Sequence, residues 1–252
     1  MRSLMMAALG ACTLAAPLSA QEAPADQIER AVLALEDEYD EAYGDWRQEL
    51  MARSSAYREE RKTNPDATLE RLAPIEPTFW PRFDEAATAG STRAQMWCIE
   101  HFPSSREYTD AQRADFTRRV LAVLADPKAP MAKLPGFVMR RGMQGPLDKP
   151  TADALLVLIG QVATDQAIAA EAAYDRVALF EERNGTEEQK KATLEGYRAV
   201  AAAFPTAKHG MRAGGKVFTV ERLQIGMVAP EIIGKDVDGN DMKLSDFRGK
   251  VT

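Results

Sequence analysis

Two cysteines are the most reactive side chains in this 252-residue sequence. Cys12 falls in the apolar N-terminal stretch, and Cys98 falls in the run Trp97-Cys98-Ile99. The apolar neighbours of Cys98 favour a buried thiol, which behaves as a small hydrophobic side chain. The alternative is a resolving or sensor thiol, because Arg93 and His101 are within reach along the same predicted helix. We favour the inert thiol and assign no catalytic role to Cys98.

Histidines and acidic residues are the other groups that could bind a metal ion. His101 and His209 lie far apart, and neither belongs to a His-x-x-x-His or Glu-x-x-His pair. We therefore expect no metal site from them. The run from Asp236 to Asp241 carries oxygen ligands of the kind found in calcium loops. It is too short and lacks the distal bidentate glutamate, so we interpret it as a turn and expect no metal and no cofactor.

Residues 1–20 have the features of a secretory signal peptide. Arg2 supplies a positive charge, the stretch from Leu4 to Leu18 is apolar, and Leu18-Ser19-Ala20 places small residues before a cleavage point. Residues 21–25 then form a short linker of alanine and proline type. This pattern predicts an exported protein of the periplasm or cell envelope. The run Leu9-Gly10-Ala11-Cys12 also resembles a lipobox, which leaves a lipid anchor at Cys12 as the alternative.

Charge and cysteine content exclude several classes of partner. The formal net charge is −6, and the pI is close to 5.2. No basic patch dominates, so we expect no nucleic acid partner. Once the signal peptide is removed, Cys98 remains, which excludes an internal disulfide in the sequence as given. A lone thiol is unusual in an oxidising compartment.

Residues 26–222 are predicted to form an all-helical domain. Apolar residues recur at steps of three and four from Ile28 to Leu50, which is the pattern of an amphipathic helix. Two capping-box patterns, Thr109-x-x-Gln112 and Thr186-x-x-Gln189, mark further helix starts. About seven to nine helices with short loops are expected, so the fold class is mainly α, either a bundle or a short α-solenoid of helix pairs. In the helix after Thr164, the candidates for the buried face are Ile168, Ala172, Val177 and Phe180.

Two stretches of this domain carry conflicting signals. The stretch from Leu72 to Pro81 is rich in proline, so a continuous helix is not expected there. Pro81 is expected in the first turn of a helix that Gly90 ends. Residues 129–146 combine apolar side chains that could pack with prolines and glycines that break regularity.

Residues 223–252 change to β-type patterning. The expected order is strand, tight turn, strand, single helical turn and the start of a new strand. A glycine in the turn reaches positive φ at no steric cost. These features are carried by Ile232, Ile233 and Val237 before the turn, Asp238-Gly239 in it, Met242 and Leu244 after it, then Ser245, Gly249 and Lys250.

This tail resembles the opening segment of a thioredoxin-like domain. It is similar above all to extracytoplasmic thiol–disulfide oxidoreductases of the TlpA/ResA type, which are redoxins, and second to peroxiredoxins of the AhpC/TSA branch. The helical part also resembles the N-terminal part of long TlpA-type proteins. The matching positions are Gly226-x-x-Ala229-Pro230, Asp236-x-Asp238-Gly239 and Leu244-Ser245-Asp246-x-x-Gly249-Lys250-Val251.

The resemblance implies redox cysteines beyond Thr252. In the TlpA/ResA type, the strand that begins at Lys250 leads to a Cys-x-x-Cys pair, and protein thiols and disulfides are the substrates. The sequence as given would then be a fragment truncated before the active site of an enzyme, and we expect it to be redox-inactive. A peroxiredoxin would carry a Thr-x-x-Cys motif after Thr252 instead.

A non-catalytic helical interaction or scaffold protein is the second hypothesis. It predicts that the tail is a decorative hairpin packed on the helices. The thioredoxin-like hypothesis predicts that the apolar side chains of the tail lack a full sheet to pack against, because such a sheet needs further strands and helices. The side chains concerned are Ile232, Val237, Leu244 and Val251.

Overall fold

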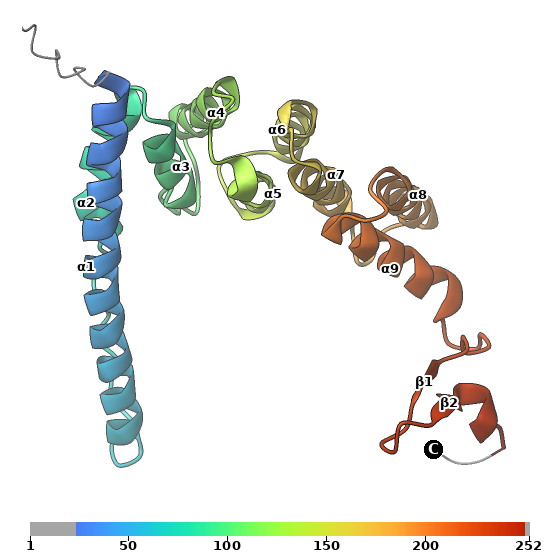
Figure 1. The fold of residues 1–252 in the computed structure, drawn as a ribbon. Coiled ribbons are helices and arrows are strands. Elements are labelled where there is room, and N and C mark those ends of the chain that lie inside the picture. Colours follow the sequence, from blue (N-terminus) through green and yellow to red (C-terminus); the bar gives the residue numbers. More distant parts are fainter. Residues whose placement is uncertain (1–23, 250–252) are drawn as a thin grey trace, which may run out of the picture. The chain divides into compact units, whose positions relative to one another are not determined.

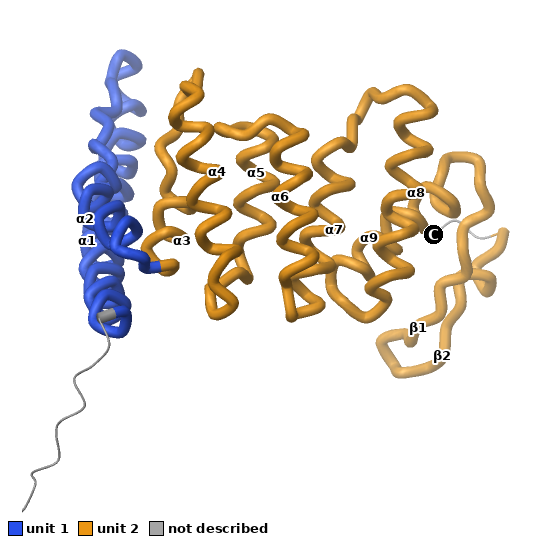
Figure 2. The backbone as a smooth tube through the Cα atoms, turned by 90° about the horizontal axis from the view of Figure 1, so that it is seen from above, with its two compact units in different colours: residues 1–91 blue, residues 92–252 orange. Residues whose placement is uncertain are grey.

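A computed structural model describes residues 24–249 of the chain (Figure 1). The described part is mainly α-helical and ends in a small antiparallel hairpin, which confirms the predicted fold class. Two compact units divide the chain between Ser91 and Thr92 (Figure 2). This boundary lies inside the region 26–222 that was expected to be one helical domain. The tail belongs to the second unit.

The first unit consists of a long helix and a short one. Helix α1 (Pro24–Arg61) buries Val32, Leu35 and Tyr39 at the spacing expected of one helical face. Helix α2 (Glu76–Thr88) packs on it, and the rings of Tyr39 and Phe79 meet edge to face with centroids 5.3 Å apart. These aromatic and aliphatic side chains form the core of the unit.

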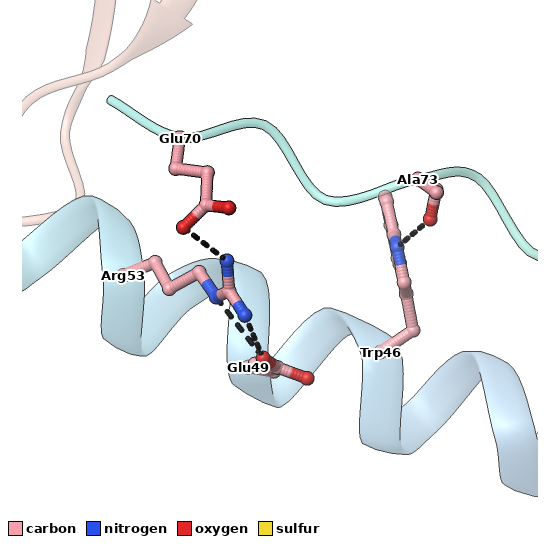
Figure 3. Close-up of polar contacts among 5 residues, drawn as sticks. All are labelled: Trp46, Glu49, Arg53, Glu70 and Ala73. Atoms are coloured by element: carbon pink, nitrogen blue, oxygen red, sulfur yellow. Dashed lines mark hydrogen bonds and ion pairs between the residues drawn. The ribbon is translucent and has the colours of Figure 1, made fainter. Parts of the chain in front are cut away.

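The segment between α1 and α2 runs back along α1 (Figure 3). The indole Nε1 of Trp46 donates a hydrogen bond of 2.8 Å to the carbonyl oxygen of Ala73. The Arg53 guanidinium donates to Glu49 at 3.0 Å and to Glu70 at 3.3 Å. Trp46 and Arg53 therefore hold a proline-containing segment against the helix that precedes it.

Helix α2 starts earlier than the sequence predicts. It begins at Glu76 and places Pro77 in its first turn, so Pro81 lies inside the helix. Proline there removes one backbone hydrogen bond. Phe79 and Phe83 lie one turn apart and are both buried, and their packing outweighs that loss. The predicted end is confirmed, because Gly90 has φ +105° and the last turn closes with a bond from the Ser91 amide to the Ala86 carbonyl.

The second unit is a run of consecutive helices in which each packs on its near neighbours. Contacts join α3 to α4, α5 to α6, α6 to α7, α7 to α8 and α8 to α9, and also α5 to α7 and α7 to α9. Contacts with the next and next-but-one helix are typical of a solenoid of helix pairs. The helices are α3 (Thr92–Glu100), α4 (Asp110–Ala125), α5 (Leu134–Gln144), α6 (Lys149–Val162), α7 (Gln166–Phe180), α8 (Glu187–Ala203) and α9 (Lys208–Arg222), with a 3₁₀ turn at Met131–Lys133.

Local capping sets the helix starts in this unit. Both predicted capping boxes are confirmed. The backbone N–H of Gln112 donates to the Thr109 hydroxyl oxygen, and the backbone N–H of Gln189 donates to the Thr186 hydroxyl oxygen, each at 3.2 Å. Residues 129–146, where the signals conflict, contain α5. Gly142 serves its packing, because a Cβ there would lie 2.5 Å from the Cβ of Ala152 on α6.

The tail forms the expected hairpin. Strand β1 (Ile233–Lys235) pairs antiparallel with β2 (Asp241–Lys243), so that Ile233 faces Lys243 and Gly234 faces Met242. Gly239 takes φ +87° in the turn, and a 3₁₀ turn (Leu244–Phe247) follows β2 before Gly249 at φ +78°. The predicted order is confirmed as far as Gly249. Lys250 and the strand expected from it lie outside the described residues.

Candidate functional site

The turn of the hairpin is held by its own acidic residue. Asp236 Oδ1 accepts hydrogen bonds from the amides of Asp238, at 2.9 Å, and Asn240, at 2.8 Å. Asp236 Oδ2 accepts from the Asn240 side chain at 3.0 Å. The bonds from Asn240 hold the pKa of the Asp236 carboxyl below its usual value. This carboxylate is engaged in shaping the turn, as the interpretation of the run as a turn requires.

One face of the hairpin carries apolar side chains. Strand pairing and the alternation of side chains place Ile232, Met242 and Leu244 on the same face,. Ile232 is 66% exposed, and Met242 and Leu244 are each more than one-third exposed. We call these three residues the apolar hairpin face. A two-stranded hairpin is marginal by itself, and this face leaves its apolar side chains in contact with solvent,.

Cys98 lies in α3 and is fully buried. Its neighbours Trp97 and Ile99 are buried as well. His101 stacks on the Trp97 ring with centroids 4.2 Å apart, and its Nδ1 lies 2.9 Å from the Trp97 carbonyl oxygen. The thiol is shielded from solvent, which is the environment of an inert core cysteine rather than a reactive one.

The two histidines have different surroundings, because His101 directly follows α3 and His209 lies in α9. His209 belongs to α9 and contacts the ring of Tyr174 on α7 at a centroid distance of 5.5 Å. Burial lowers the pKa of His209 below its ordinary value. Within residues 24–249, no group of three or more histidine, cysteine, aspartate or glutamate side chains is placed to hold a metal ion.

A polar cleft that the sequence did not predict lies on α5, α7 and α9. It has a volume of about 440 Å³, within the range of small-molecule sites. Titratable side chains from separate helices converge on it, which is a feature of functional sites. We call it the α7–α9 cleft, and its lining residues are Met139, Tyr174, Asp175, Ala178, Glu181, Arg183, Arg212 and Lys216.

One wall of the α7–α9 cleft is an ordered hydrogen-bond network around Glu181. The Tyr197 hydroxyl donates to Glu181 at 2.7 Å, and the Lys216 ammonium donates at 2.8 Å. Burial alone would raise the pKa of Glu181, but the bonds from Lys216 and Tyr197 outweigh it, so the pKa is lowered. Burial and the Glu181 carboxylate raise the pKa of Tyr197. Glu181 is therefore an ionised acceptor with its partners fixed.

Asp175 has the opposite environment in the same cleft. Burial, reinforced by the charge of Glu171, raises its pKa to about 7 against the weaker opposing effect of Arg212 and Arg140. Two carboxyl groups of one cleft thus differ in charge near neutral pH, because one has hydrogen-bonding partners and the other is mainly desolvated.

The sequence contained a weak signal for this cleft. Glu171, Tyr174 and Asp175 recur at helical spacing on α7, with Glu181 as its C-cap, and Arg212 and Lys216 do so on α9. Such patterns usually belong to a solvated helix face. The predicted apolar face of α7 was partly wrong, because Phe180 is exposed and Tyr174 is buried. Tyr174, an aromatic residue among charged residues at that spacing, was the indication that this helix face is covered.

Comparison with models of protein families, with curated proteins and with solved structures gave no match for this chain. No helix within residues 24–249 is both long and apolar enough to cross a membrane. The signal peptide at 1–20, the lipid anchor at Cys12 and most of the linker at 21–25 lie outside the described residues. These expectations stay predictions.

Proposed function

We propose that the tail is the opening segment of a thioredoxin-like domain and that the chain belongs to an exported thiol–disulfide oxidoreductase. Residues 26–222 would then be a helical domain that precedes the redoxin domain. The resemblance of the tail to TlpA/ResA-type proteins motivates this proposal. A peroxiredoxin is the variant within the same fold.

The apolar hairpin face is the observation that carries the proposal. Ile232, Met242 and Leu244 line one side of two short strands, and all three are exposed. In a thioredoxin-like domain, the central strands and a helix would cover such a face. Gly249 has φ +78° after the 3₁₀ turn, and the resemblance places the next strand at Lys250. Residues 223–249 would thus serve the scaffold of the domain and not its chemistry.

The chemistry would belong to a cysteine pair that follows Thr252. A thiolate at the N-terminus of a helix attacks one sulfur of a substrate disulfide, that bond breaks, and a mixed disulfide forms. The second cysteine of the pair then attacks the mixed disulfide and releases the reduced substrate. The cysteine pair of the enzyme is then itself a disulfide, because it has supplied two electrons to the substrate. Cys98, buried in α3, takes no part.

The test begins with the codons that follow Thr252 in the gene. A Trp-Cys-x-x-Cys within about fifteen codons supports the oxidoreductase, and a Thr-x-x-Cys supports the peroxiredoxin. A stop codon, or a continuation without cysteine, contradicts both. Insulin reduction by dithiothreitol then provides the activity assay. The polypeptide Met1–Thr252 should match the control without protein, and a chain extended through the cysteine pair should accelerate the reaction.

Matched variants make this assay specific. Replacing both expected cysteines of the extended chain with serine should abolish the acceleration. Cys98→Ser should leave it unchanged, since that thiol is buried away from solvent. Acceleration by Met1–Thr252 alone that disappeared in Cys98→Ser would refute the assignment.

A non-catalytic interaction module is the second candidate, and one observation favours it. Helices α6 to α8 border a cavity of about 480 Å³ with mostly apolar lining, including Val177, Phe180 and Phe204. Helical repeats use such surfaces to bind partners. This candidate would stand if the gene carries no cysteine after Thr252.

A further inference from the structure

The α7–α9 cleft holds more positive charge than its own carboxylates neutralise. Arg183, Arg212 and Lys216 line it together with Asp175 and Glu181. Lys216 and Glu181 form an ion pair at 2.8 Å. Within the described residues 24–249, neither Arg212 nor Arg183 forms an ion pair or a side-chain hydrogen bond with another residue. Two guanidinium groups therefore remain available to a ligand.

The position of Arg212 suits it to a planar anion. Its guanidinium carbon lies 5.0 Å from the centroid of the buried Tyr174 ring. Packing on an aromatic face orients the guanidinium plane and leaves its N–H groups directed outward in a fixed fork. This fork matches the two oxygens of a carboxylate. Tyr174 is itself held by contact with Tyr197, at a centroid distance of 5.2 Å.

Asp175 gives the cleft a titratable group beside these guanidinium groups. The charged groups that act on it are Glu171 on α7 itself, Arg140 on α5 and Arg212 on α9. The helices packed on α7 also carry Asp153 on α6, which pairs with Arg176, and Tyr197 on α8 and His209 on α9, which contact Tyr174. When Asp175 is neutral it can donate a hydrogen bond to an anion. When it is ionised, it repels the anion and competes for Arg212.

We propose that the α7–α9 cleft binds a small carboxylate-bearing anion through Arg212 and Arg183, and that ionisation of Asp175 weakens this binding. The Glu181, Lys216 and Tyr197 network keeps the wall of the cleft in place and supplies no free acceptor to compete with the ligand. The apolar parts of Met139 and Ala178 complete the lining. This inference is independent of the thiol chemistry proposed for the chain.

Calorimetric titration of the full chain with succinate tests the ligand class. Succinamide is the uncharged probe of the same length, and inorganic phosphate is the anion of different shape. Succinate should bind, phosphate should bind more weakly, and succinamide should not bind measurably. Failure of succinate to bind at millimolar concentration, equal binding of succinamide, or tighter binding of phosphate would overturn the assignment.

Variants on α9 test the site. Arg212→Gln should weaken succinate binding by about tenfold or more, as expected for loss of a charge-assisted hydrogen bond. Arg222→Gln is the matched control, because Arg222 lies on the same helix and does not line the cleft. Both variants should keep the wild-type circular dichroism spectrum. Equal weakening in the two variants would show that the anion does not bind at this cleft.

The pH dependence tests the role of Asp175. Wild-type affinity for succinate should fall severalfold between about pH 6.5 and about pH 8.5, a range in which both carboxyl groups of succinate are mostly ionised. Asp175→Asn should bind succinate with nearly constant affinity over the same range. His209 cannot supply this dependence at its upper end, because its pKa is lowered and it is neutral there. A fall in affinity of the same size in Asp175→Asn would refute the role of Asp175.

Discussion

The two glycines Gly210 and Gly215 of α9 allow a test in which the same substitution has opposite effects. A Cβ built on Gly210 would lie 1.7 Å from the carbonyl oxygen of Phe204, and real Cβ atoms essentially never come within 3.0 Å of such an atom. That oxygen accepts the bond from the Ala207 amide that shapes the turn between α8 and α9. A Cβ built on Gly215 meets nothing within 4 Å.

The expected magnitudes follow from these distances. Alanine is favoured over glycine in a helix by about 0.5–1 kcal/mol, so Gly215→Ala should raise the free energy of unfolding by that amount. Gly210→Ala gains the same propensity but must displace the turn, and overpacking of this kind typically costs about 1–3 kcal/mol or more. The two variants should therefore differ by about 2 kcal/mol, or roughly 4–8 °C in Tm for a chain of this size.

Urea unfolding followed by far-ultraviolet circular dichroism measures both variants against the wild type. Gly214→Ala is a second reference, because its Cβ would lie 3.8 Å from the Cβ of Ala201, an ordinary contact. If Gly210→Ala were as stable as Gly215→Ala, α9 could not lie as close to the Phe204 carbonyl oxygen as described. The packing of α8 on α9 would then need revision.

Three further predictions concern groups described above. Asp175 keeps its proton up to about pH 7 in the folded state but releases it near pH 4 when unfolded, so the folded state binds more protons in between and stability falls as pH rises,. Asp175→Asn should thus gain stability over the wild type at about pH 8 and gain less at about pH 5 in urea unfolding, and an equal gain at both would contradict the raised pKa. Tyr197→Phe removes the hydroxyl that donates to Glu181 and should lower the free energy of unfolding by about 1 kcal/mol, whereas an unchanged urea midpoint would show that the bond contributes nothing,. The Cys98 thiol, followed as the difference between wild type and Cys98→Ser, should react slowly with a disulfide reagent in the native protein and rapidly in guanidinium chloride, and equal rates would refute its burial,.

The features that the sequence predicted well are those decided within a few residues of the chain. Each capping box joins a threonine to a glutamine three residues later, and both were found at Thr109 and Thr186. The hairpin turn likewise depends on Asp236, Gly239 and Asn240, which contact one another directly. Local hydrogen bonds of this kind leave a readable pattern.

The features that the sequence did not predict depend on residues far apart in the chain. The start of α2 follows from burial of Phe79, which meets Tyr39 of α1, and of Phe83, and this burial overrides the local effect of Pro81. The α7–α9 cleft exists because Asp175 and Arg212 meet after two helix reversals. Taken one helix at a time, each charged residue is indistinguishable from one on a solvated face.

The tail shows why a confirmed local structure does not by itself decide function. The two strands pair with each other and Asp236 fixes the turn, so the same hairpin would form in a redoxin and in a decorative tail. What differs between the two is the environment of Ile232, Met242 and Leu244. A decorative tail would bury these side chains on the helices, and they are exposed. The proposal that the tail belongs to a larger sheet rests on this exposure of the apolar hairpin face, and the codons after Thr252 test it.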